Sequence, residues 1–174
     1  MEHGLALTRD LARRSFAVTG AELLVGAIAF LVVVTCVLFH YEVMSVTSRR
    51  LPSVRVPRRA RIVGLILVML AAHVVEVWIF GLTYWLLDRW PELGTLQGDF
   101  QEGALDFVYY SVTVFTTLGF GDIVPTGPVR VLTGAEALSG LGLITWSASL
   151  GFLEMQRDWY EYHRQRPGRP APRE

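Results

Sequence analysis

Two stretches of the chain, residues 21–41 and 62–87, are almost wholly apolar and long enough to cross a lipid bilayer. About twenty apolar residues in helical conformation span the hydrocarbon core of a membrane. Because lipid offers no hydrogen-bond partner to free backbone groups, such stretches must be helical. The composition agrees, since 52% of the residues are hydrophobic and 18% are charged. The sequence therefore predicts an all-α membrane protein.

A third apolar stretch, residues 129–154, gives a predicted third span, and a shorter one precedes it at residues 105–116. The shorter stretch cannot cross the membrane, so we expect a re-entrant helix that is buried by protein. Six arginines and no acid between residues 45 and 61 mark a cytoplasmic loop. We expect the protein to lie in the inner membrane of the cell. With three spans, the preference of arginine for the cytoplasmic side places the N-terminus outside and the C-terminal tail in the cytoplasm.

The segment that follows the short stretch reads Thr116-Thr117-Leu118-Gly119-Phe120-Gly121-Asp122-Ile123-Val124-Pro125. A backbone that strips water from a cation must aim successive carbonyl groups at one axis. Gly119 and Gly121 allow the left-handed backbone angles that this arrangement requires, which a Cβ would penalise. The residue types therefore indicate an ion-binding backbone, held between two long apolar helices.

This segment resembles the selectivity filter of potassium channels, whose usual form is Thr-Val-Gly-Tyr-Gly-Asp; here Leu118 and Phe120 replace the valine and the tyrosine. Residues 62–154 resemble the pore module of that family, with an outer helix, a pore helix, the filter and an inner helix. The resemblance implies a potassium-selective channel that needs no cofactor. Since one chain carries one filter strand, it also implies a homotetramer in the bilayer. Potassium ions would bind at Thr117, Leu118, Gly119 and Phe120, with Gly121 completing the filter.

The resemblance also implies roles for residues around the filter. Phe120 lacks the hydroxyl by which a filter tyrosine bonds to the pore helix, so Tyr109 and Tyr110 must find other partners. The residues expected to support the filter are Thr116, Asp122, Tyr109 and Tyr110. On the inner helix we expect a hinge at Gly140 and Gly142, and a cavity lined by Thr145, Ser149 and Leu153.

Three ionisable residues, His73, Glu76 and Glu136, lie inside predicted spans. Such groups are costly in a membrane and usually face protein with a partner. Counting along each helix from its outer end puts Glu76 and Glu136 at similar depths. We therefore expect Glu136 to meet His73 or Glu76; the alternative is that each bonds a nearby backbone group.

These features divide the chain into five parts: a lead-in at 1–20, a helix at 21–44, a basic loop at 45–61, a pore domain at 62–154 and a partly disordered tail at 155–174. Two other functions stay open: a weakly selective cation channel or a subunit that conducts only with a partner, and, less favoured, a membrane enzyme or structural protein. No nucleophile–base pair or metal-ligand cluster with recognisable spacing supports an enzyme, and nothing points to nucleic acid.

Overall fold

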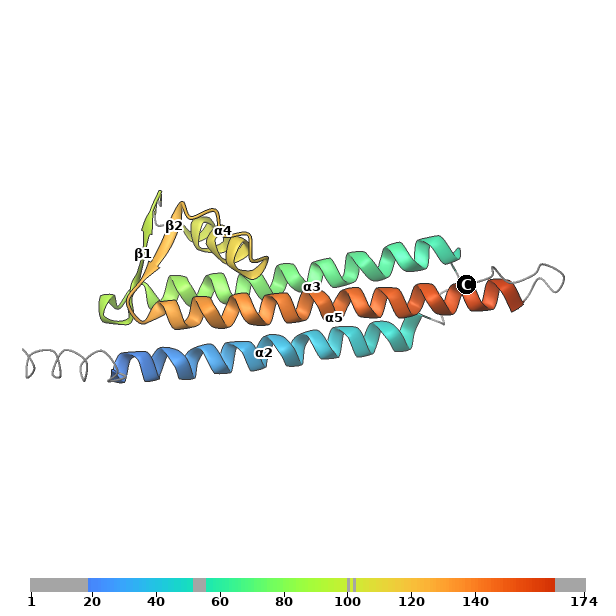
Figure 1. The fold of residues 1–174 in the computed structure, drawn as a ribbon, viewed down its shortest axis with the longest axis horizontal. Helices are drawn as coiled ribbons and strands as arrows, with labels where there is room; N and C mark the ends of the chain where they lie inside the picture. Colours follow the sequence, from blue (N-terminus) through green and yellow to red (C-terminus); the bar gives the residue numbers. More distant parts are fainter. Residues whose placement is uncertain (1–18, 52–55, 100, 102, 165–174) are drawn as a thin grey trace, which may run out of the picture.

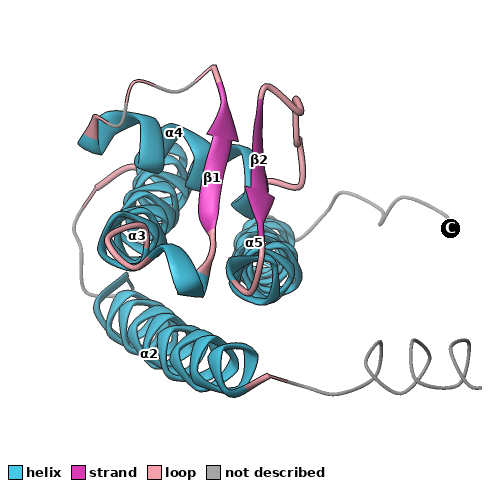
Figure 2. Ribbon diagram, turned by 90° about the vertical axis from the view of Figure 1, so that its left-hand side faces the viewer, coloured by secondary structure: helices cyan, strands magenta, loops and turns pink. Residues whose placement is uncertain are grey.

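The computed structural model describes residues 19–51, 56–99, 101 and 103–164, and three long helices lie side by side along its long axis (Figure 1). The short helix α4 and a two-stranded sheet lie at one end, on the side of α3 and α5 opposite to α2 (Figures 1 and 2). The elements in chain order are α2 (Gly20–Arg50), α3 (Arg58–Leu87), the 3₁₀ helix η2 (Pro91–Leu93), β1 (Thr95–Gly98), α4 (Ala104–Phe115), β2 (Ile123–Thr126) and α5 (Val129–Arg164).

Two of the helices, α2 and α3, are long and apolar enough to cross a membrane. Many of their large apolar side chains face outward, among them Phe30 on α2 and Leu70 on α3. In water such surfaces would be costly, whereas lipid accepts them. The predicted helical membrane protein is confirmed at this level. Helix α5 is long enough for a third span, with 36 residues, but Glu136 and several glycines make it less apolar. The third span therefore stays a prediction.

Local sequence sets where the helices begin. At the start of α2, the Thr19 hydroxyl accepts a hydrogen bond from the Glu22 N–H, and the Glu22 carboxylate accepts the Thr19 N–H at 2.7 Å. This capping box satisfies two backbone groups that the helix leaves free. At the start of α4, the Asp106 carboxylate accepts the N–H groups of Gln101 and Gly103 at 3.0 and 3.3 Å. The acid also complements the positive end of the helix dipole.

The basic segment predicted as a loop at 45–61 is mostly helical, so that boundary is wrong. Helix α2 continues to Arg50, and α3 begins at Arg58. Serine and threonine do not stop a helix that already has a turn to extend, whereas proline does. Pro57 is the N-cap residue of α3. At the other end, α5 carries the helix to Arg164, and the remainder of the predicted tail lies outside the described residues.

The segment between α3 and α4 contains a strand. Strand β1 pairs antiparallel with β2, with Thr95 opposite Thr126 and Gly98 opposite Ile123. Gly98 has a φ of 133°, and a Cβ there would clash with the carbonyl oxygen of Asp122. A glycine is therefore needed for this close approach. The sheet joins the chain before α4 to the chain after residue 122. It therefore fixes both ends of the segment that contains α4 and the loop after it.

Helix α4 is held by close packing against α3 and α5. Phe107 and Phe115 of α4 are fully buried with Phe80 of α3. Gly140 of α5 lies against the last turn of α4, where a Cβ would meet the Phe115 carbonyl oxygen and come 2.9 Å from its Cγ. Because this contact leaves no room for a side chain, Gly140 sets how closely α4 approaches α5.

Candidate functional site

The loop from residue 116 to residue 122 leaves the carboxyl end of α4 and is exposed along its length. Its φ angles are positive at alternate residues: 59° at Thr117, 51° at Gly119 and 81° at Gly121. Among the described residues, Thr117 is the one non-glycine with a positive φ. A side chain in this region costs about 1–2 kcal/mol, so the conformation must be imposed by its surroundings. An alternation of this kind turns successive peptide planes so that neighbouring carbonyl groups can face one side.

Two backbone hydrogen bonds attach the start of this loop to the last turn of α4. The Thr117 N–H donates to the Val114 carbonyl at 2.9 Å, and the Gly119 N–H donates to the Thr113 carbonyl at 3.0 Å. The carboxyl end of a helix carries the negative end of its dipole. The loop therefore begins where the field favours a cation.

Side chains of α4 hold the far end of the loop. The Tyr109 hydroxyl donates to the Asp122 carboxylate at 2.7 Å, and this bond lowers the pKa of Asp122. Tyr110 instead bonds to the Thr133 hydroxyl at 3.0 Å. Both tyrosines have thus found partners other than Phe120, whose ring is 65% exposed. The Thr116 hydroxyl donates back to the Val112 carbonyl of its own helix.

The residues expected to form a hinge and a cavity lie on a continuous helix. Helix α5 runs unbroken through Gly140 and Gly142, and Gly140 is needed for packing as described above. Space is open around Gly142. The expected cavity residues, Thr145, Ser149 and Leu153, are all exposed on α5. Their roles as hinge and lining stay predictions.

Glu136 forms a buried network of its own, so the expectation that it meets His73 or Glu76 is wrong. The Tyr84 hydroxyl donates to Glu136 Oε2 at 2.5 Å, and Ser111 Oγ lies 2.5 Å from Glu136 Oε1. Ser111 Oγ also lies 2.9 Å from the Val77 carbonyl oxygen. A serine has one hydroxyl proton and cannot donate to both oxygens. A protonated Glu136 satisfies all three contacts, because its own O–H then donates to Ser111.

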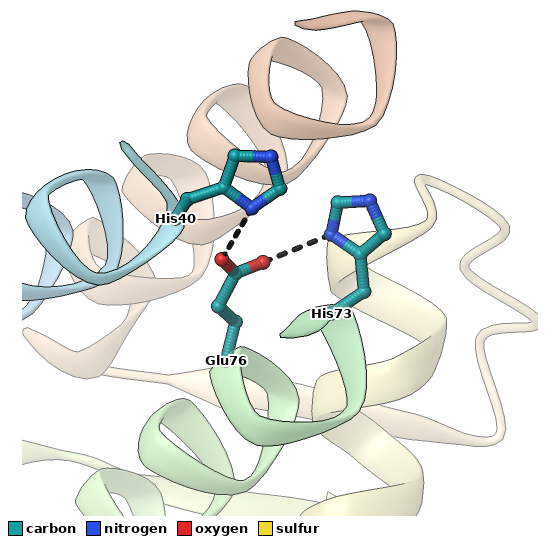
Figure 3. Close-up of side chains that lie close together, drawn as sticks. All are labelled: His40, His73 and Glu76. Carbon is teal, nitrogen blue, oxygen red and sulfur yellow. Dashed lines mark hydrogen bonds and ion pairs between the residues drawn. The ribbon is translucent and has the colours of Figure 1, made fainter. Parts of the chain in front are cut away.

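His73 and Glu76 meet a third residue instead, His40 of α2. His40 Nδ1 lies 2.8 Å from one oxygen of Glu76, and His73 Nδ1 lies 2.9 Å from the other (Figure 3). On the far side of both rings is Ser147 of α5, whose Oγ lies 3.0 Å from His40 Nε2 and 3.2 Å from His73 Nε2. The sequence had one signal for His40, a histidine inside an apolar span, and the prediction missed it.

Residues 72–156 match the model of a protein family described as an ion channel. This segment, called the channel domain below, is similar to that family. It begins within α3, takes in α4, the loop and the sheet, and ends within α5. The resemblance to the potassium-channel pore family is thereby confirmed. Neither the curated proteins nor the solved structures that were compared include a match.

The two polar networks lie at different levels of the channel domain because α3 and α5 run antiparallel with a fixed register. Tyr84 is bonded to Glu136; His73, eleven residues earlier, is bonded to Ser147, eleven residues later. Glu76 is therefore roughly 12 Å along α3 from the level of Glu136. The prediction that Glu76 and Glu136 lie at similar depths was wrong, because it counted from the end of each helix. Helix α5 begins about one turn beyond the end of α3, so the two counts start at different levels.

Helix α2 lies outside the matched residues, yet it is bonded to the channel domain. His40 is fully buried and bonds to Glu76 of α3 and to Ser147 of α5. Nearer the start of α2, the buried Val25, Ala29 and Cys36 belong to the same apolar core as Phe80. Helix α2 is therefore an integral part of the fold, and His40 is the residue that joins it to α3 and α5 by hydrogen bonds.

Proposed function

We propose that four copies of this chain form a potassium-selective pore, with the 116–122 loop as the selectivity filter. The observation that carries this proposal is the alternation of positive φ at Thr117, Gly119 and Gly121. The carbonyl oxygens of Thr117, Leu118, Gly119 and Phe120 then replace the hydration shell of K⁺.

Fourfold assembly follows from the exposure of the filter. One backbone strand cannot surround an ion, whereas a closed ring of identical strands can. Neighbouring copies, together with lipid, would also cover exposed apolar side chains of α4 and α5, since Leu105 is 70% exposed and Leu138 is 76% exposed. A homotetramer buries the loop and gives its carbonyl groups a common axis.

The proposed orientation places the filter at the outer face of the cell membrane. Arg49 and Arg50 at the end of α2, and Arg59 and Arg61 at the start of α3, all lie at the end of the bundle away from the sheet (Figure 1). Basic residues flanking membrane spans favour the cytoplasmic side. Acids gather at the filter end instead, where four copies raise the local concentration of cations: Asp88, Glu92, Asp99, Asp106 and Asp122.

Flux from purified protein in liposomes tests this function. Vesicles loaded with KCl should take up rubidium in exchange, and external sodium should neither enter nor compete. Equal rubidium and sodium fluxes would favour the weakly selective cation channel. The absence of flux from tetrameric protein would favour a subunit that needs a partner. Mass measurement in mild detergent checks the assembly, and a uniform monomer or dimer would contradict it.

A further inference from the structure

Three potential metal ligands, His40, His73 and Glu76, converge in the interior of the helix bundle. One ligand atom from each lies within 4.8 Å of the others. His40 and Glu76 are fully buried, and the His73 side chain is 15% exposed. Both imidazoles turn the same ring nitrogen, Nδ1, toward the single carboxylate (Figure 3).

The hydrogen atoms of this cluster do not balance when Glu76 is ionised and both histidines are neutral. If each Nδ1–H donates to Glu76, both Nε2 atoms are acceptors, and both face the oxygen of Ser147. That hydroxyl can donate to one of them only. The second Nε2 then faces a lone pair of Ser147 Oγ, an imbalance that one further proton in the cluster, or a cation in its place, removes.

We propose that His40, His73 and Glu76 bind a divalent transition-metal ion of the zinc class through the two Nδ1 atoms and the carboxylate. Two imidazoles and one carboxylate are a ligand set that Zn²⁺ takes. A tetrahedral ion with bonds of about 2.0–2.1 Å separates its donor atoms by about 3.3 Å. The Nδ1 atoms now lie 2.8 and 2.9 Å from different oxygens of Glu76, so a rotation of the carboxylate brings one oxygen to both. All three donor atoms already lie within 4.8 Å of one another, and small side-chain shifts bring them to the tetrahedral spacing. The inference does not depend on ion conduction.

Ser147 supplies the outer shell that such a site requires. A histidine that binds metal through Nδ1 keeps its proton on Nε2 and normally donates it to an oxygen. Both Nε2–H groups then donate to Ser147 Oγ, which has two lone pairs. The metal thus resolves the imbalance with both imidazoles neutral, and it joins α2, α3 and α5 through one centre.

His73 gives the ion its entry path and room for a fourth ligand. A pocket of about 400 Å³ between α3 and α5 is lined by both His73 and Ser147. Water or a small anion reaching the metal from this side completes the coordination. An anion there also balances the charge that remains after Glu76 neutralises half of the divalent ion.

Titration with Co²⁺, a coloured substitute for Zn²⁺, tests the site in the full-length protein purified without an affinity tag. The chain has four histidines, so a background variant with His3→Gln and His163→Gln leaves only His40 and His73. We expect one Co²⁺ per chain, with the visible absorption of a tetrahedral site that Zn²⁺ abolishes. His40→Gln and Glu76→Gln should each weaken binding more than 100-fold, and Ser147→Ala should weaken it about 10- to 100-fold.

Matched controls separate loss of the site from general damage. Ser149→Ala, two residues after Ser147 on α5, and Glu154→Gln should bind Co²⁺ as the background protein does. Folding of each variant is checked by helical circular dichroism and by its elution volume. Failure of the folded background protein to take up Co²⁺ or Zn²⁺ overturns the proposal, and so does uptake that His40→Gln and Glu76→Gln leave unchanged. Either result leaves the proposed channel function as it stands.

Discussion

Tyr109 and Asp122 are joined by a 2.7 Å hydrogen bond that links the middle of α4 to the residue that follows Gly121. The start of the 116–122 loop is attached by the backbone bonds of Thr117 and Gly119 to the last turn of α4, and its far end is also held by the Asp99 N–H, which donates to the Asp122 carbonyl. The phenol–carboxylate bond adds a side-chain link between this far end and α4.

Replacing Tyr109 by Phe should raise the pKa of Asp122 back toward its ordinary value of 3.8. The bond favours the ionised carboxylate, so its contribution is fully present above that ordinary value. It is lost as the pH falls through the lowered pKa of the native protein. Titration of the Asp122 carboxyl by NMR measures the shift. Tyr41→Phe on α2 serves as the control, and indistinguishable Asp122 titrations in Tyr109→Phe and wild type would show that the bond does not form.

Substitution of Gly119 or Gly121 by Ala should abolish potassium-selective flux. A Cβ at either position meets nothing within 4 Å, so the penalty comes from the backbone alone. With φ at 51° and 81°, that penalty is about 1–2 kcal/mol per residue. The backbone relieves it by turning a carbonyl group away from the common axis. Rubidium and sodium fluxes in liposomes measure the loss.

Gly134→Ala is the matched control for these filter variants. Gly134 also has open space around its Cβ position, but it lies within α5 and has no positive φ. Alanine favours a helix over glycine by about 1 kcal/mol, so this variant should conduct normally and unfold no more easily. Wild-type selectivity in both filter variants would end the assignment of this loop as a filter.

Gly140→Ala and Gly142→Ala distinguish packing from hinge motion. At Gly140 a Cβ collides with the backbone of Phe115, which cannot move aside as a side chain could. Overpacking of this kind costs typically 1–3 kcal/mol. At Gly142 the space is open. We expect a lower unfolding temperature for Gly140→Ala only, whereas a hinge shared by both glycines predicts altered flux in both variants.

Glu136→Gln should leave the stability of the folded protein within about 1 kcal/mol of wild type, while Glu136→Leu should be strongly destabilising. The amide can donate to Ser111 and accept from Tyr84, as the protonated acid does. Leucine leaves the Tyr84 hydroxyl without its carboxyl acceptor, at about 1–3 kcal/mol, and removes the hydrogen bond that Ser111 accepts, while Ser111 still donates to the Val77 carbonyl. Thermal unfolding ranks the variants. Infrared spectroscopy gives an independent check, since Glu136→Gln should remove a carboxylic-acid carbonyl band; a wild-type spectrum without that band would mean that Glu136 is ionised.

The sequence was informative where one local rule decides the outcome. The length of the apolar run around Leu70 required a helix, and the glycines at 119 and 121 predicted the positive φ angles that the loop has. It was less informative where a result depends on two segments that are distant along the chain. The pairing of Thr95 with Thr126 leaves little trace in either strand, and the depth of Glu136 depends on the register of α5 against α3.

The same register limits how α3 and α5 can move relative to each other. Tyr84–Glu136 and His73–Ser147 cross-link the two helices at levels roughly 16 Å apart. A slide of one helical turn, about 5.4 Å, would separate both pairs at once and take one hydrogen bond from each of the four polar groups. Because the two hydrogen-bonded pairs lie at different levels, they also resist a change in the crossing angle between α3 and α5. Any opening of a pore built from this bundle must therefore move the cross-linked parts of both helices as one rigid unit and bend α5 between Ser147 and its end at Arg164.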